Sequence, residues 1–194
     1  LHLLSRRQRQ MCIRDSVGKY QERYCEILGR MVKKMTGVCL TDSISGNFIM
    51  QMIPHHMAAV EMSANILKYT KEPRLIQIAS HIISSQKESI ENMRKIQDCC
   101  SAVQNTACDS MQYKKCYEQI INTMFSQMRC ARESNSVDAD FLRQMLPHHE
   151  GAVCMSKNAL RYDICAPLIP ILKQIITSQC KGIEEMNHLL SCLS

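Results

Sequence analysis

The sequence predicts an all-α protein, a helical bundle built from two tandem helical repeats. The chain repeats itself at an offset of 93 residues, and 23 of the 50 positions in 47–96 are identical to those in 140–189. This identity is far above chance for an internal repeat. The composition also favours helices, because the chain has only 6 Gly and 5 Pro, few aromatic residues and no Trp. Long helices with short connections fit these numbers better than a β-sandwich or a barrel.

Residues 1–16, LHLLSRRQRQMCIRDS, have no counterpart in the second copy and no helical periodicity. We expect a non-native or artefactual segment that contributes nothing to the fold. The segment carries four Arg and one Asp, so the formal net charge of +6 falls to +3 without it. The basic balance is therefore a weak reason to expect nucleic acid or an anionic membrane. Because the chain begins with Leu, we expect the true N-terminus, and any signal peptide, to be missing.

The first repeat, residues 17–98, is predicted to form three helices. The first, over 18–37, has one apolar face at spacings of four and three, made of Tyr20, Tyr24, Ile27, Met31 and Met35. The second begins near the turn residues 41–47, where Asp or Ser can cap it, and runs to about Tyr69. Pro73 marks a break before the third, over 74–97.

The second repeat, residues 112–194, has the same pattern, and residues 99–111 are predicted to link the two. We expect the copies to pack around a pseudo-twofold axis, with the last two helices of each forming a central four-helix layer. No apolar run approaches the roughly 20 residues that a transmembrane helix needs.

The most conserved part of the repeat is FIMQMIPHHMAAVEM at 48–62, which returns as FLRQMLPHHEGAVCM at 141–155. Thioethers and imidazoles are soft to borderline ligands, so the retained residues indicate copper-type chemistry. The predicted ligands of the first copy are Met52, His55, His56, Met62 and Met93. Their counterparts are Met145, His148, His149, Met155 and Met186. Because the sets are twinned, we expect one site in each copy, with near-equal affinity.

Each of these residues also has a purely structural interpretation. Methionine at helical spacing usually fills a core, which is our expectation for Met31 and Met35. Adjacent histidines are awkward in a core, because each ring needs a polar partner. Pro54 either kinks the helix from inside or begins a shorter helix. His81 and His188 have no histidine counterpart, and we expect them at the surface.

The chain has 12 cysteines, or 11 without Cys12, and an odd number argues against complete pairing. The ends of the predicted helices would allow two disulfides, Cys39–Cys99 and Cys130–Cys192, and free thiols are the alternative. A ferritin-type di-iron site needs a Glu-x-x-His motif on each of two helices. The chain has one such run, Glu185-Met186-Asn187-His188, and the first copy has no counterpart of it, so we do not expect a di-iron site.

The run Met52-Ile53-Pro54-His55-His56, followed by Ala59-Val60 and Met62 and later by Gln86 and Met93, resembles the domain-of-unknown-function family numbered 305. Both copies match it, over most of 41–97 and 134–190. The resemblance implies a ferritin-like helical bundle and an association with copper and silver handling in bacteria. Met57, which is Glu150 in the second copy, and the many cysteines depart from the family pattern.

The resulting hypothesis is a non-enzymatic bundle that sequesters or passes on copper as Cu(I), or silver as Ag(I), with a copper donor or acceptor protein as partner. One alternative is an interaction or scaffold protein whose Met-rich faces bind another helix. A second alternative is a copper-dependent redox enzyme. A copper role slightly favours an extracytoplasmic location, although no signal peptide is visible.

Overall fold

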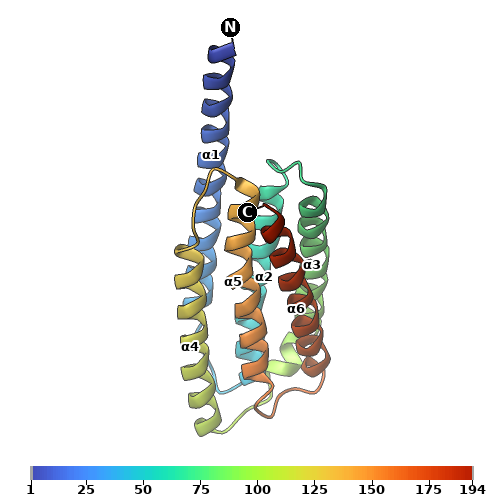
Figure 1. Ribbon diagram of the computed structural model, residues 1–194. Coiled ribbons are helices and arrows are strands. Elements are labelled where there is room, and N and C mark those ends of the chain that lie inside the picture. The colour runs from blue at the N-terminus through green and yellow to red at the C-terminus, as the bar shows by residue number, and fades with distance from the viewer. Residues whose placement is uncertain (1, 194) are drawn as a thin grey trace.

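In the computed structural model, the backbone of residues 2–193 and the side chains of residues 15–193 are described. Over this part of the chain the secondary structure is six α-helices without a strand, which confirms the all-α prediction (Figure 1). The helices are α1 (His2–Thr36), α2 (Ile44–Ile66), α3 (Pro73–Ser101), α4 (Ala107–Arg129), α5 (Val137–Ala159) and α6 (Leu168–Leu193). Among the residues whose side chains are described, no helix is long and apolar enough to cross a bilayer.

Polar residues cap the beginnings of the helices as the sequence predicts. The Ser43 hydroxyl accepts a hydrogen bond from the Gly46 backbone N–H at 3.1 Å and so starts α2. Its counterpart Ser136 accepts from the Ala139 N–H at 3.3 Å and starts α5. Each cap satisfies one of the four N–H groups that the first turn of a helix leaves without a partner.

Helices α2, α3, α5 and α6 form the centre of the bundle, while α1 packs on α2 and α4 packs on α5. Helices α2 and α5 run in opposite directions (Figure 1). A pseudo-twofold axis perpendicular to these helices therefore relates the copies. Tyrosine hydroxyls cross between the copies, because Tyr20 donates to Gln144 Oε1 at 2.7 Å and Tyr113 donates to Gln51 Oε1 at 3.2 Å.

The short link between the copies ties both of them together. Helix α3 continues to Ser101 and α4 begins at Ala107, so the connection is shorter than the predicted 99–111. The Asn105 backbone N–H donates to the Asp42 carbonyl at 2.9 Å, and its side-chain amide donates to the Asp163 carbonyl at 2.6 Å. One asparagine thus joins the loop before α2 to the loop before α6.

Helix α1 begins at His2 rather than near residue 18, so the backbone of 2–16 is helical despite its lack of apolar periodicity. This first part projects beyond the other helices (Figure 1). The side chains of residues 1–14, including Cys12, lie outside the described residues. That the segment contributes nothing to the fold stays a prediction.

The predicted disulfides are wrong. Cys39, Cys99, Cys130 and Cys192 are free thiols, and the disulfide joins Cys100 to Cys165, with their Cα atoms 5.2 Å apart. The reason is that the end of α3 packs against the loop before α6, across the two copies, rather than against the loop after α1. The disulfide therefore links the copies instead of closing one of them.

Candidate metal centre

Both proline residues of the repeated motif lie well inside their helices. Pro54 is in the middle of α2, and Pro147 is in the middle of α5. The first-turn interpretation of Pro54 is therefore wrong. A proline inside a helix removes one backbone donor and bends the helix away from the carbonyl four residues back. Each proline directly precedes its histidine pair in the sequence.

The two histidine pairs meet at the pseudo-twofold axis. The rings of His55 and His148 stack with their centroids 3.6 Å apart and their planes 28° apart. Within each copy the neighbouring rings have the same arrangement, at 5.9 Å for His55 and His56 and 6.0 Å for His148 and His149, with 54° between planes in both. The structure therefore places one layer of four imidazoles on the axis, instead of one separate pocket in each copy.

All four side chains are buried, and burial sets their charge. His55, His56 and His148 are inaccessible to solvent, and His149 is 2% exposed. Burial lowers the pKa of His56 to about 3 and that of His148 to about 4. The pKa values of His55 and His149 are also lowered well below the usual 6.5, first by burial and then by repulsion from the other rings. The layer is therefore neutral at physiological pH, which is the form in which imidazole binds a metal.

Most ring nitrogens of this layer lack a hydrogen-bond partner in the protein. His148 Nε2 lies 3.1 Å from the His55 carbonyl oxygen, which can only accept, so Nε2 donates and Nδ1 carries a lone pair. His56 Nε2 bonds with the Ser89 hydroxyl at 3.1 Å. The nitrogens without a partner at hydrogen-bond distance and angle are His55 Nδ1, His55 Nε2, His56 Nδ1, His148 Nδ1 and His149 Nδ1. The backbone carbonyls of His148 and Met145 still act on His55 and His149, where they oppose the lowering of the pKa by burial.

Two glutamines and a narrow polar cleft adjoin the layer. The side-chain oxygens of Gln86 and Gln179 are buried and have no hydrogen-bond partner. Both residues line a cleft of about 40 Å³ between α3 and α6 that reaches His56 and is otherwise walled mainly by Ser, Asn and Ile. A cleft of this size and polarity admits a water molecule or an ion.

The six predicted methionine ligands are all in the core, with exposures of 0–2%. Met52 is four residues from His56, so the two side chains are neighbours on one face of α2. Met93 is four residues from Ser89, which itself bonds with His56. Met62 lies about 9 Å further along the helix axis than His56. By helix geometry, Met52 and Met93, with their counterparts Met145 and Met186, are thus better placed than Met62 and Met155.

The imidazoles alone are not a complete ligand set. Among the described residues, no three of their nitrogens lie within 4.8 Å of one another, whereas the sulfurs of Cys99, Cys100 and Cys165 do. A site at the axis would therefore combine one or two imidazoles with thioether sulfur. Such a mixed set suits Cu(I) better than Zn²⁺, whose protein sites are usually tetrahedral with three or four N, S or O ligands.

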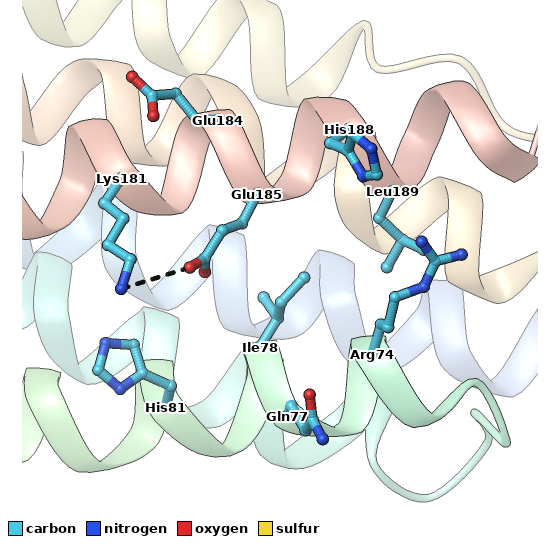
Figure 2. Close-up of a pocket in the computed structure, with 9 residues that line it drawn as sticks. All are labelled: Arg74, Gln77, Ile78, His81, Lys181, Glu184, Glu185, His188 and Leu189. Carbon is cyan, nitrogen blue, oxygen red and sulfur yellow. Dashed lines mark ion pairs between the residues drawn. The ribbon is translucent and has the colours of Figure 1, made fainter.

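A larger groove of about 500 Å³ lies between α3 and α6 at the surface (Figure 2). His81 and His188 line it, and both are exposed, as predicted. Lys181 Nζ and Glu185 form an ion pair at 3.7 Å, and the groove histidines stand on facing helices without converging. In this groove, too, the described His and Glu side chains do not form a group of three close ligands.

Two residues of these sites, Ser89 and Cys165, have no identical counterpart in the repeat, which is why their roles were not predicted. Ser89 bonds with His56, but its counterpart is Gly182, so a search for twinned residues passes over it. Cys165 is likewise replaced by Glu72 in the other copy. The bare backbone of Gly182 lets the His149 ring come close, since a Cβ there would lie 3.1 Å from its Cδ2.

Residues 46–190 match the family described as "Domain of unknown function (DUF305)". The chain belongs to this family. A single match of the DUF305 description spans both halves, so the family is confirmed, whereas two tandem copies of the family domain stay a prediction.

The fold of a DUF305 relative has been solved. The chain is similar to a crystal structure of a DUF305 fragment from Deinococcus radiodurans, with a TM-score of 0.55 and 21% identity over 76% of this chain and 95% of that one. At this identity the likeness shows the fold alone.

A segment of the chain also resembles an uncharacterised protein of Acanthamoeba polyphaga mimivirus, with 49% identity over 47 residues. That segment is 24% of this chain, and it spans about a third (31%) of the length of the relative.

Proposed function

We propose that this DUF305 protein binds copper as Cu(I), or silver as Ag(I), in the layer of four histidines and holds the ion for storage or transfer to a partner protein. The observation that carries the proposal is the set of buried, neutral imidazoles whose nitrogens lack partners in the protein. Burying polar groups without hydrogen bonds destabilises a protein. A bound metal ion would provide a partner for these ring nitrogens and would offset the cost of burying them.

The surroundings of the histidines favour a soft ion. The thioethers of Met52 and Met145 lie one turn from His56 and His149 on the same helices. Thioether sulfur carries no proton and prefers Cu(I) over harder ions. Two-coordinate or three-coordinate binding by imidazole and thioether needs no set of three convergent nitrogens.

Two other functions fit less well. The cleft at His56 holds about 40 Å³, while sites for organic substrates have volumes of roughly 300–1,000 Å³. A redox enzyme acting on an organic substrate would therefore need a different opening. A scaffold that binds a partner through Met-rich faces would have to expose these methionines, which lie in the core with exposures of 0–2%.

The test is a titration with Cu(I) against a competing chelator, carried out with the Cys100–Cys165 disulfide intact. His55→Gln and His148→Gln together should remove most of the binding, because these two rings meet at the axis. The matched control is His81→Gln with His188→Gln, two exposed histidines, and it should bind as the wild type does. Equal binding by both double variants, with folding checked by circular dichroism, would show that the stacked pair His55 and His148 is not the site. Equal binding after His56→Gln and His149→Gln are added would exclude the whole histidine layer.

A further inference from the structure

Three cysteine sulfurs converge at the end of the bundle where α3 stops. The Sγ atoms of Cys99, Cys100 and Cys165 all lie within 4.8 Å of one another. Cys100 and Cys165 are buried and joined by the disulfide, while Cys99 is exposed and free. The group therefore has a buried pair and a third thiol that solvent reaches.

Backbone hydrogen bonds hold the buried pair in place independently of the disulfide. The Cys100 carbonyl accepts from the Ser43 hydroxyl at 3.0 Å, and the Cys165 N–H donates to the Ser45 hydroxyl at 2.9 Å. The Cys165 carbonyl also accepts from the Leu168 N–H at 2.9 Å. Both cysteines are thus fixed to the beginning of α2 or α6, and their sulfurs would stay close after reduction.

The other end of the bundle serves as an internal comparison. At the positions related by the offset of 93, it has Cys192, Leu193 and Glu72 in place of Cys99, Cys100 and Cys165. The thiol of Cys192 accepts a 3.9 Å hydrogen bond from Arg74 instead of meeting other sulfurs. The convergence of three sulfurs is therefore particular to one end and is not a consequence of the repeat.

We propose that, when the disulfide is reduced, Cys99, Cys100 and Cys165 form a second site that binds a soft monovalent ion such as Cu(I) through three sulfurs. This site does not depend on the histidine layer. A dithiol reductant supplies two electrons and two protons, the Cys100–Cys165 bond breaks, and the reductant becomes a disulfide. Cu(I) then displaces the protons of the thiols as the sulfurs bind it.

The local charges suit this chemistry at Cys165. The residue lies three positions before α6, and Ser45 places it beside the beginning of α2. The positive ends of the two helix dipoles stabilise negative charge there. Cys100 lies at the negative end of the α3 dipole, which disfavours a thiolate there. A bound cation would neutralise that thiolate and so stabilise it. In the oxidised protein two of the three sulfurs form the Cys100–Cys165 disulfide, so the three-sulfur site cannot bind the ion.

The test compares oxidised protein with protein reduced by a dithiol, from which the reductant has then been removed under anaerobic conditions. Cu(I) is titrated against a competing chelator, and thiolate-to-copper charge-transfer absorption is recorded. The reduced form should bind about one more equivalent than the oxidised form, as a single three-sulfur site requires. Loss of a residue that only supports a metal ligand typically lowers metal affinity by roughly tenfold to hundredfold. Because Cys99 is itself a proposed ligand, Cys99→Ser should lower the affinity of the extra site by at least that factor.

Cys99→Ser leaves the buried pair intact, so the variant should fold as the wild type does. Cys192→Ser, at the related position of the other end, is the matched control and should keep the extra equivalent. If Cys99→Ser binds as much as the wild type, or if Cys192→Ser loses as much, the three-sulfur site is excluded and the disulfide is structural only. A variant without His55 and His148 should keep the extra equivalent, which separates this test from that of the histidine layer.

Discussion

The four histidines of α2 and α5 and the three cysteines where α3 ends are two contrasting sets of soft ligands, and α3 passes both of them. Gln86, Met93 and Cys100 are seven residues apart along α3 and all buried, so one stripe of the helix joins the two regions over about 21 Å. The histidines lie on the pseudo-twofold axis and occur in both copies. The cysteines lie off the axis and come from both copies, but they converge at one end of the bundle only, because the counterparts of Cys100 and Cys165 are Leu193 and Glu72.

This difference shows what a duplicated sequence constrains. A residue on the axis packs against its own counterpart, as His55 packs against His148, so a substitution in one copy must still fit the residue of the other copy. Residues at the two ends do not meet their counterparts and can diverge. The axis therefore preserves a shared chemistry, while each end can acquire its own.

Acid should produce the largest effect, and it should act on the histidine layer. The folded pKa values, about 3 for His56 and about 4 for His148, lie below the 6.5 of an unfolded chain. The unfolded state therefore binds more protons, and the stability that is present above pH 6.5 is lost as the pH falls toward 4. Each histidine should cost about 2 kcal/mol between pH 7 and pH 5. Urea unfolding of the metal-free protein at both pH values measures this.

Titration of the reduced protein with Cu(I) at the same two pH values distinguishes the two regions. Because the folded imidazoles are already neutral, Cu(I) affinity at the layer should change little between pH 7 and pH 5. Affinity at the cysteines should fall, because thiols must lose protons to bind. Stability that does not change over this range would mean that the rings titrate normally and are not sealed from water.

Loss of the disulfide should have the next largest effect. It closes a loop of 65 residues, and bonds of this kind typically contribute about 2–4 kcal/mol. Cys100→Ser together with Cys165→Ser should lower the free energy of unfolding by that amount. Cys39→Ser together with Cys130→Ser, two exposed thiols, is the control. A Tm equal to that of the wild type would show that the two halves hold together without the bond.

Removing one imidazole should stabilise the metal-free protein while weakening metal binding. Neither ring nitrogen of His55 has a partner at hydrogen-bond distance and angle, because its contact with the His148 carbonyl falls short of that geometry. His55→Leu should therefore raise the free energy of unfolding by about 1 kcal/mol. His81→Leu, at an exposed position, should change it by less than about 0.5 kcal/mol. A loss of several kcal/mol in His55→Leu would identify the ring as a structural residue.

The difference between Ser89 and Gly182 should have a smaller effect. Ser89→Gly removes the hydrogen bond to His56 and should cost about 1 kcal/mol. Gly182→Ala puts a Cβ about 3.1 Å from the His149 ring, which must then shift. Overpacking costs about 1–3 kcal/mol, and the gain of about 1 kcal/mol that Ala has over Gly inside a helix reduces the net loss. Thermal unfolding of both variants measures this, and no change in either would mean that the layer tolerates movement.

Deleting residues 1–16 should have the smallest effect, because the segment projects beyond the other helices (Figure 1). The Tm of the shortened chain should equal that of the full chain. A drop of several degrees would show that this part of α1 contributes to the fold.

The sequence predicts the elements of the fold well, because helix periodicity and capping are local signals. It gives the order of helices, Ser43 as a candidate cap and the break before Pro73. It also predicts that α2, α3, α5 and α6 form the centre. It does not give the helical start of α1, since a helix without an apolar face leaves no periodic signal.

The sequence predicts the candidate site only in part, because periodicity shows which residues share a face but not which faces meet. It selects His55 and His56, whose side chains point about 100° apart. In the structure His55 stacks on His148 of the other copy, and His56 forms a hydrogen bond with Ser89 on α3. The cysteine pairing was missed because Cys165 has no counterpart, and the repeat was the only guide.

The crossing hydrogen bonds of Tyr20 and Tyr113 have a consequence for assembly. Each half offers one tyrosine and receives one on its glutamine, so the halves form an isologous interface within a single chain. A half expressed alone would expose this self-complementary surface, and a second copy of the same half would fit it. A homodimer with true twofold symmetry is therefore the natural assembly of one repeat, and the covalent link at Asn105 replaces that dimer with a chain whose two halves are free to differ.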